Sequence, residues 1–123
     1  MSTAPASLAM VTIDCADPQK EATFWAAALG WDVMYSDKDY GMVGNGSQRL
    51  GFGRVEGWKA PSWPNTSGTK QFHLDLAVLD LAEAEQAMLD LGASKPVNQP
   101  STDWVVLQDP DGHPFCLTKA ENW

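Results

Sequence analysis

The sequence predicts an α+β domain made of two copies of one module, each a strand, a helix and three further strands. The first observation is an internal repeat, in which the stretch from Met10 to Gly53 has a counterpart from His73 to Thr118. The second is that strand-like alternation changes to a helical period at the same point of each copy, after Asp17 and after Asp80. Two such βαβββ modules predict a cupped, mixed, eight-stranded sheet with its helices outside.

The first module opens with a strand at residues 8–15, where apolar and polar side chains alternate. Asp17 and Pro18 are typical residues for a helix N-cap and first helical position, and Gly30 is typical of a helix end. Three strands are expected to follow, at Trp31–Ser36, Tyr40–Val43 and Gln48–Val55.

The second module follows the same plan. A strand at residues 72–78 precedes a helix that Asp80 caps and Gly92 ends. We expect Asp109 and Asp111 to form a turn and to carry no chemistry. The three remaining strands are expected around Ala93–Val97, Trp104–Gln108 and His113–Thr118. We expect one domain over residues 1–123, with module one at about 8–55, a linker at about 56–70 and module two at about 71–119.

The composition is that of an ordinary globular protein, with 44% hydrophobic and 20% charged residues. The formal net charge of −8 and the lack of a basic cluster argue against nucleic-acid and anionic-membrane partners. No signal peptide or apolar run of membrane-spanning length is seen. Cys15 and Cys116 fit reduced thiols better than a disulfide framework, so a cytoplasmic location is expected.

Several motifs resemble the vicinal oxygen chelate superfamily, which includes glyoxalase I, bleomycin-resistance proteins and extradiol dioxygenases. Their order and spacing match over nearly the whole chain, most closely the small glyoxalase-like proteins. The motifs are Ile13-Asp-Cys-Ala-Asp17, Phe24-Trp-Ala-Ala-Ala-Leu-Gly-Trp31, Phe72-His-Leu-Asp-Leu-Ala-Val78, Asp109-Pro-Asp-Gly112 and Phe115-Cys-Leu117.

The resemblance implies a divalent metal held by four side chains on the inner faces of the first and last strands of both modules. The equivalent positions in this chain are Met10, Gly51, His73 and Cys116. These positions offer no oxygen ligand for a hard cation, and two ligands are too few for stable zinc. Asp14 or Asp75 would have to supply a carboxylate, but each is offset along its strand from the expected ligand level. We therefore expect neither a metal nor another cofactor.

His73, Asp75 and Asp14 are the candidate catalytic residues, with His73 as a general base or ligand hydrogen-bonder whose charge an aspartate tunes. The alternative is that His73 is a packed remnant of the ancestral metal site with no present function, and that both aspartates have structural roles. Cys116 is expected to be a buried, inert thiol, because no basic residue is near it in sequence and His113 alternates to the opposite face.

The candidate ligand-binding residues lie on the strands and in the linker. Trp58 and Trp63 are expected to cover the cup and stack on a flat ligand, or else to plug its open side or form a dimer contact. The full set is Met10, Thr12, Gly51, Trp58, Trp63, His73, Val105 and Cys116.

Three functions compete. The first, which the sequence favours, is metal-free binding of a small planar or aromatic molecule in the cupped sheet, as in sequestration-type resistance proteins. The second is a metal-dependent lyase, isomerase or dioxygenase of the superfamily. The third is a metal-independent isomerase or cyclase that uses His73 with Asp75 or Asp14. The resemblance also implies a homodimer.

Overall fold

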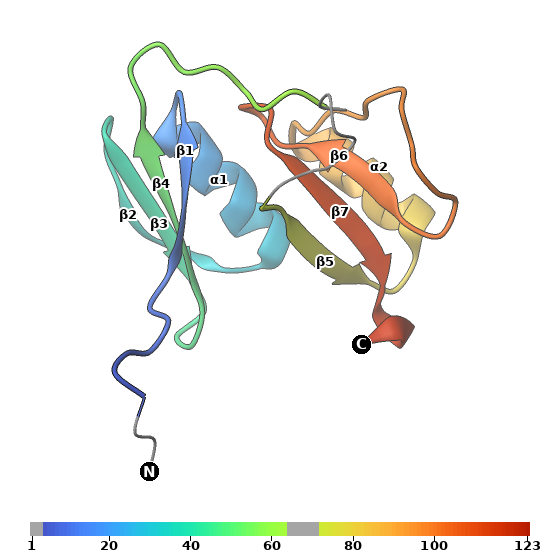
Figure 1. The fold of residues 1–123 in the computed structure, drawn as a ribbon, viewed down its shortest axis with the longest axis horizontal. Coiled ribbons are helices and arrows are strands. Elements are labelled where there is room, and N and C mark those ends of the chain that lie inside the picture. The colour runs from blue at the N-terminus through green and yellow to red at the C-terminus, as the bar shows by residue number, and fades with distance from the viewer. Residues whose placement is uncertain (1–3, 64–71) are drawn as a thin grey trace. The chain divides into compact units, whose positions relative to one another are not determined.

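The computed structural model describes residues 4–63 and 72–123, so the end of the expected linker, 64–70, lies outside the described residues. The chain divides between Glu56 and Gly57 into two compact units. Each unit contains one α-helix and one hydrogen-bonded sheet, as Figure 1 shows.

The first unit is a four-stranded sheet in the order β1-β4-β3-β2 with one helix, α1, packed against three of its strands. β1 and β4 are parallel, whereas the β4-β3 and β3-β2 pairs are antiparallel. The bounds of its elements are β1 Val11–Cys15, α1 Pro18–Leu29, β2 Asp32–Ser36, β3 Tyr40–Gly44 and β4 Arg49–Arg54. This is the strand–helix–three-strand order expected from the sequence.

The ends of α1 are set by the residues that the sequence indicates. The side chain of Asp17 accepts a hydrogen bond from the Lys20 amide at 3.1 Å, and Pro18 opens the helix. Gly30 adopts φ +69°, a left-handed conformation that few other residues adopt without strain. Inside the helix, Trp25 is buried with Phe24 and Ala22, so α1 supplies much of the core of this unit.

The second unit is a three-stranded sheet in the order β5-β7-β6 with helix α2 packed against β7. β5 and β7 are parallel, and β7 and β6 are antiparallel. The bounds of its elements are β5 Leu74–Val78, α2 Leu81–Leu91, β6 Val105–Gln108, β7 Pro114–Lys119 and a short 3-10 helix, η1, Ala120–Asn122. Asp80 caps α2 by accepting a hydrogen bond from the Glu83 amide at 2.9 Å.

The strand expected at Ala93–Val97 is reduced to a single bridge between Ser94 and Gln108. The reason is that a side chain pairs with the outer edge of β6. The amide group of Gln99 donates to the Val106 carbonyl and accepts from the Val106 amide, both at 2.9 Å. The edge is thus satisfied without a further strand, and the described residues form seven strands instead of eight.

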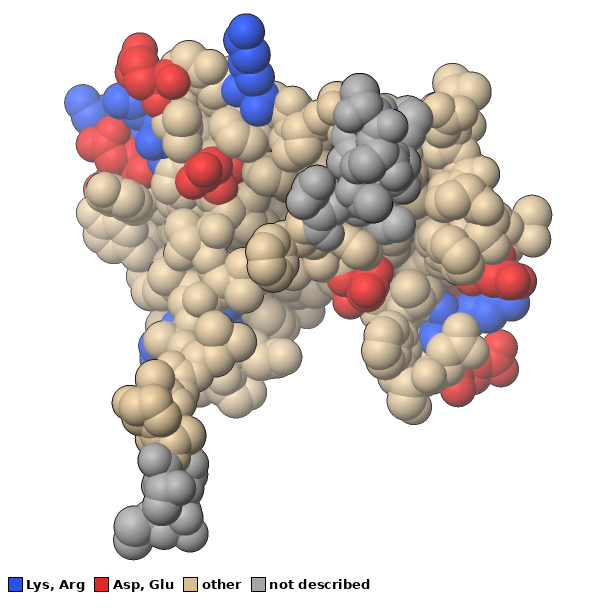
Figure 2. All heavy atoms as spheres, in the orientation of Figure 1, with Lys and Arg blue, Asp and Glu red and all other residues tan. Residues whose placement is uncertain are grey.

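Acidic and basic side chains are intermixed on the face drawn in Figure 2, where no continuous basic surface is visible. Arg54 pairs with Asp39 at 3.3 Å and with Glu56 at 2.9 Å, and Lys95 pairs with Glu85 at 2.9 Å. Within the described residues, no helix is long and apolar enough to cross a membrane.

Candidate functional site

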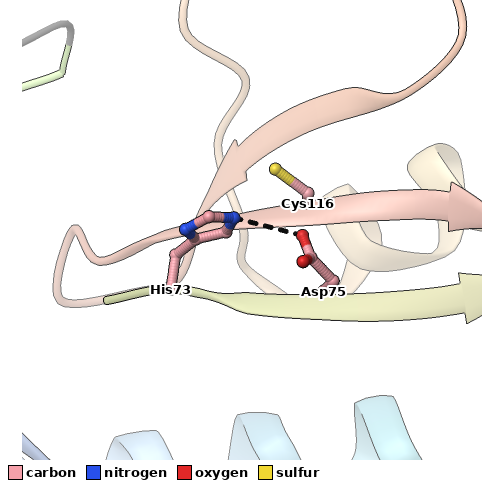
Figure 3. A group of neighbouring side chains, drawn as sticks. All are labelled: His73, Asp75 and Cys116. Carbon is pink, nitrogen blue, oxygen red and sulfur yellow. Dashed lines mark ion pairs between the residues drawn. The ribbon is translucent and has the colours of Figure 1, made fainter. Parts of the chain in front are cut away.

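Three side chains with metal-ligating or acid–base chemistry converge on the second sheet, as Figure 3 shows. His73 Nε2 lies 3.1 Å from Asp75 Oδ1, which is hydrogen-bond distance. One ligand atom from each of His73, Asp75 and Cys116 lies within 4.8 Å of the others. The His73 and Asp75 side chains are 23% and 41% exposed, whereas Cys116 is 2% exposed. We call these three residues the His-Asp-Cys cluster.

The parallel pairing of β5 with β7 brings the cluster together. Asp75 is the register partner of Cys116, so their side chains lie side by side on one face of the sheet. His73 precedes Asp75 by two residues and shares its face. Asp75 was not expected to be a ligand because it is offset from His73 along the strand, yet that offset places Asp75 level with Cys116.

The structure brings the imidazole of His73, which is far from Cys116 in sequence, close to the Cys116 thiol. The sequence analysis considered His113, but the imidazole of the cluster belongs to His73 on the neighbouring strand. On the other side of Cys116, its register partner is Val106 of β6, which is fully buried. Val106 is a residue of this face that the sequence analysis did not identify.

Val105, the candidate from β6, is the register partner of Leu117 instead. Adjacent residues of a strand point to opposite faces, so Val105 does not share the face of Cys116. A one-residue difference in register is enough to exchange the two valines.

The equivalent place in the first unit has no imidazole, carboxylate or thiol, but a threonine, a glycine and a methionine. β1 and β4 are also parallel, and Thr12 is the register partner of Gly51 as Asp75 is of Cys116. A Cβ on Gly51 would lie 3.0 Å from Met10 Sδ and 3.0 Å from Thr12 Oγ1. The methionine side chain thus occupies the space that a side chain at position 51 would need. Asp14, opposite Gly53 in this unit, is exposed.

The linker tryptophans contact the second unit. Trp58 donates from Nε1 to the Asp111 carbonyl at 3.0 Å, and its ring lies 5.0 Å from that of His113 with a 33° tilt. Trp63 donates from Nε1 to the Asn98 carbonyl at 3.3 Å. Both tryptophans are half-buried, and their contact with a ligand stays a prediction.

The turn before β7 is held by a buried carboxylate, as expected. Asp109, 2% exposed, accepts from the Asp111 amide at 3.1 Å and from the His113 amide at 2.9 Å. Because His73 is level with the start of β7, this turn and the Trp58 ring lie at the same end of the sheet as His73. Asp109 therefore has a structural role in the turn.

Two hollows on the surface of the second unit lie away from the cluster. One, of about 540 Å³, is lined by residues around Asp80 and Lys119, and the other, of about 390 Å³, by residues around Trp104 and Lys119. Both are open to solvent and neither is lined by the cluster. The donor chemistry of the cluster makes it the stronger candidate site.

Burial predicts that the Cys116 thiol reacts slowly. In a Cys15→Ala variant, where Cys116 is the remaining cysteine, labelling of the native protein by a thiol reagent is expected to be at least about 100-fold slower than that of the unfolded chain. The reason is that the reaction requires a local opening that costs a few kcal/mol. Fast stoichiometric labelling at neutral pH would show a reactive thiol beside His73 instead.

Comparison with known families supplies an identification. Residues 10–118 match the family model described as a glyoxalase-like domain, which covers both βαβββ modules. The chain belongs to the glyoxalase-like domain family. A search of curated proteins finds no match to this glyoxalase-like domain.

Solved structures show the same fold. A glyoxalase/bleomycin resistance protein/dioxygenase family enzyme from Burkholderia phytofirmans is 20% identical, with 94% of this chain and 99% of that chain covered and a TM-score of 0.67. The bleomycin-binding protein of Streptomyces verticillus, complexed with copper(II)-bleomycin, is 16% identical over 95% and 98%, with a TM-score of 0.58. Trypanothione-dependent glyoxalase I from Leishmania major is 17% identical over 95% and 88%, with a TM-score of 0.61. The predicted fold class is confirmed.

The four positions that the superfamily resemblance assigns to a shared metal do not fit such an ion in this chain. Gly51 has no side chain, and Met10 offers only a thioether, which is a poor ligand for a hard cation. The remaining two positions, His73 and Cys116, both belong to the second unit. Of these four positions, the two with an imidazole or a thiol therefore lie in one of the two modules of this glyoxalase-like domain.

Proposed function

We propose that this glyoxalase-like domain binds a small molecule on the face of its second sheet that carries His73, Asp75 and Cys116. The observation that carries the proposal is the close His73–Asp75 pair, whose Nε2 and Oδ1 atoms are 3.1 Å apart and partly exposed, beside the buried Cys116. Binding sites typically combine a few well-oriented polar groups with apolar surroundings. Val106, the buried register partner of Cys116, is an apolar neighbour of the cluster on the same face of the sheet.

The pair is suited to recognition because its geometry is fixed before a ligand arrives. A carboxylate at hydrogen-bond distance holds the imidazole in one orientation, so less side-chain freedom is lost on binding. The two groups together offer a ligand both hydrogen bonding and negative charge. A cationic or hydrogen-bonding molecule fits this chemistry best, in keeping with the acidic net charge of −8.

A planar or aromatic ligand is the class we favour, held without the superfamily's shared four-ligand metal. Trp58 and Trp63 supply half-buried indole rings in the same unit, and Trp58 lies at the His73 end of the sheet. The bleomycin-binding protein, whose fold this chain shares, is a precedent for small-molecule binding on this fold. We also propose that the protein is a cytoplasmic homodimer, as expected from the sequence, but the binding proposal does not depend on either property.

A second candidate function is proton transfer by the same pair in a metal-independent isomerase or cyclase. The carboxylate of Asp75, 3.1 Å from the His73 imidazole, favours it, because an oriented imidazole is a common general base. The two candidates differ in what happens to the ligand. A bound molecule that is recovered unchanged supports binding, and a converted molecule supports catalysis.

The pair's role can be tested with matched variants. A panel of planar aromatic compounds that includes bleomycin is titrated by calorimetry into protein kept in chelator. His73→Ala and Asp75→Asn are each expected to weaken the tightest interaction by about 10- to 100-fold, because a hydrogen bond to a charged group contributes about 1.5–3 kcal/mol.

Asp103→Asn is the control for this titration, since it makes the same chemical change at an exposed position of the same unit and is expected to leave affinity unchanged. Melting temperatures of the variants show whether the fold is intact. Equal affinities for the wild type, His73→Ala and Asp75→Asn would contradict the proposed function.

A further inference from the structure

We infer that His73, Asp75 and Cys116 form a binding site for a zinc-like divalent ion within the second unit alone. The inference concerns the residues of the proposed function but does not depend on a small-molecule ligand. It rests on the convergence of one nitrogen, one oxygen and one sulfur donor. This set differs from the superfamily's shared positions, because it includes Asp75 and draws nothing from the first unit.

The distances suit a small tetrahedral ion. Zinc lies about 2.0–2.2 Å from nitrogen and oxygen ligands and about 2.3 Å from sulfur, so ligand atoms in a tetrahedral site are about 3.4–3.6 Å apart. His73 Nε2 and Asp75 Oδ1 are 3.1 Å apart, and the three ligand atoms lie within 4.8 Å of one another. A shift of about 1 Å, within the reach of side-chain rotation, would bring all three to bonding distance.

The donor set selects the kind of ion. A thiolate and an imidazole favour zinc and similar borderline or soft ions, whereas Mg²⁺ and Ca²⁺ require several oxygen ligands. Asp75 is the single carboxylate of the cluster. Zinc is therefore expected to bind much more tightly than Mg²⁺.

The number and exposure of the ligands also fit. Three protein ligands with one position left for water or another molecule is the usual arrangement of an open zinc site. Cys116 anchors the cluster on its buried side at 2% exposure, and the Asp75 side chain is 41% exposed on the other. The fourth position is thus expected to face outward from the sheet.

The test is metal binding by the purified chain, produced without a polyhistidine tag. The wild type is expected to retain about one zinc ion per chain after dialysis, and its cobalt derivative to show a sulfur-to-cobalt charge-transfer band. Asp75→Asn and Cys116→Ser are each expected to lower zinc affinity by more than about 100-fold, the upper end of what losing a hydrogen-bond partner of a metal ligand costs.

Two controls and a fold measurement make the result decisive. Asp103→Asn and Cys15→Ala change the same residue types outside the cluster and are expected to keep zinc binding. Far-ultraviolet circular dichroism checks that each variant is folded, and Asp75→Asn provides a second test if Cys116→Ser unfolds. No retained zinc in the wild type, equal zinc affinity in folded Asp75→Asn, or a cobalt spectrum without the charge-transfer band would overturn the inference.

The outcome is separable from that of the proposed function. Zinc binding is measured with the metal alone, whereas small-molecule binding is measured in chelator. A protein that binds compounds but no zinc would overturn the metal site and leave the proposed function standing. Zinc binding by the wild type, together with equal affinity for compounds in the wild type and in the His73 and Asp75 variants, would overturn the proposed function and leave the metal site standing.

Discussion

Replacing Trp25 with alanine is expected to destabilise the first unit by about 3–5 kcal/mol, the usual cost of removing a buried large aromatic side chain. Trp25 is 1% exposed and meets Phe24 edge to face, with ring centroids 5.1 Å apart. Its Nε1 also donates to Glu21 Oε2 at 3.3 Å, and Glu21 is fully buried. The variant therefore loses packing and removes a donor from a buried carboxylate, a second source of destabilisation.

Urea unfolding followed by far-ultraviolet circular dichroism measures this effect. Small domains are stable by about 5–15 kcal/mol, so the loss is a large part of the total. Trp123→Ala is the matched control, because Trp123 is 76% exposed and its indole makes one exposed hydrogen bond. A cost below about 1 kcal/mol at Trp25, or equal costs at both positions, would contradict the assigned core.

Replacing Gly41 with valine is expected to cost about 3 kcal/mol, at the upper end of the range for overpacking a core. A Cβ at position 41 would lie 2.8 Å from the Pro18 carbonyl oxygen and 3.3 Å from Ala22 Cβ. The first of these atoms is helix backbone and cannot move without displacing the start of α1. Glycine at this position thus permits the close packing of α1 on β3.

Gly53→Val is the control for this packing effect. Gly53 lies in β4, opposite Tyr40, and a Cβ there would meet nothing within 4 Å. Valine favours strands, so this variant is expected to be neutral or slightly stabilising. Thermal melts of the two variants measure the difference, and equal melting temperatures would show that Gly41 is not needed for helix packing.

The elements with strong local signals were predictable from the sequence. Asp17 and Asp80 cap the two helices as expected, because an N-cap interaction involves residues three apart and is visible in sequence. The absence of a strand at Ala93–Val97 was not predictable, since the edge of β6 pairs with the Gln99 side chain and with Ser94. That pairing depends on a loop conformation that alternation of residue types does not report.

The candidate site was predictable in part. The positions of His73 and Cys116 follow from the family resemblance, but the approach of Asp75 depends on the register between β5 and β7. Val105 was expected on this face, but Val106 lies there, because the register between β6 and β7 decides which residue of a strand faces the cluster. Register is set by pairing between distant segments, which a single sequence does not reveal.

The two modules share a backbone register but differ in side-chain chemistry. Thr12 and Asp75 occupy equivalent positions, as do Gly51 and Cys116. In the first unit, the Met10 side chain fills the space beside Gly51. In the second unit, the side chains of His73, Asp75 and Cys116 come together around the equivalent place. We therefore propose that recognition occurs in the second unit.

A map of amide chemical-shift changes in isotope-labelled protein, titrated with the tightest-binding compound of the planar aromatic panel, tests this assignment most directly. The largest changes are expected in β5 and β7, at and beside His73, Asp75 and Cys116. Changes confined to the first unit, around Met10 and Gly51, would contradict it.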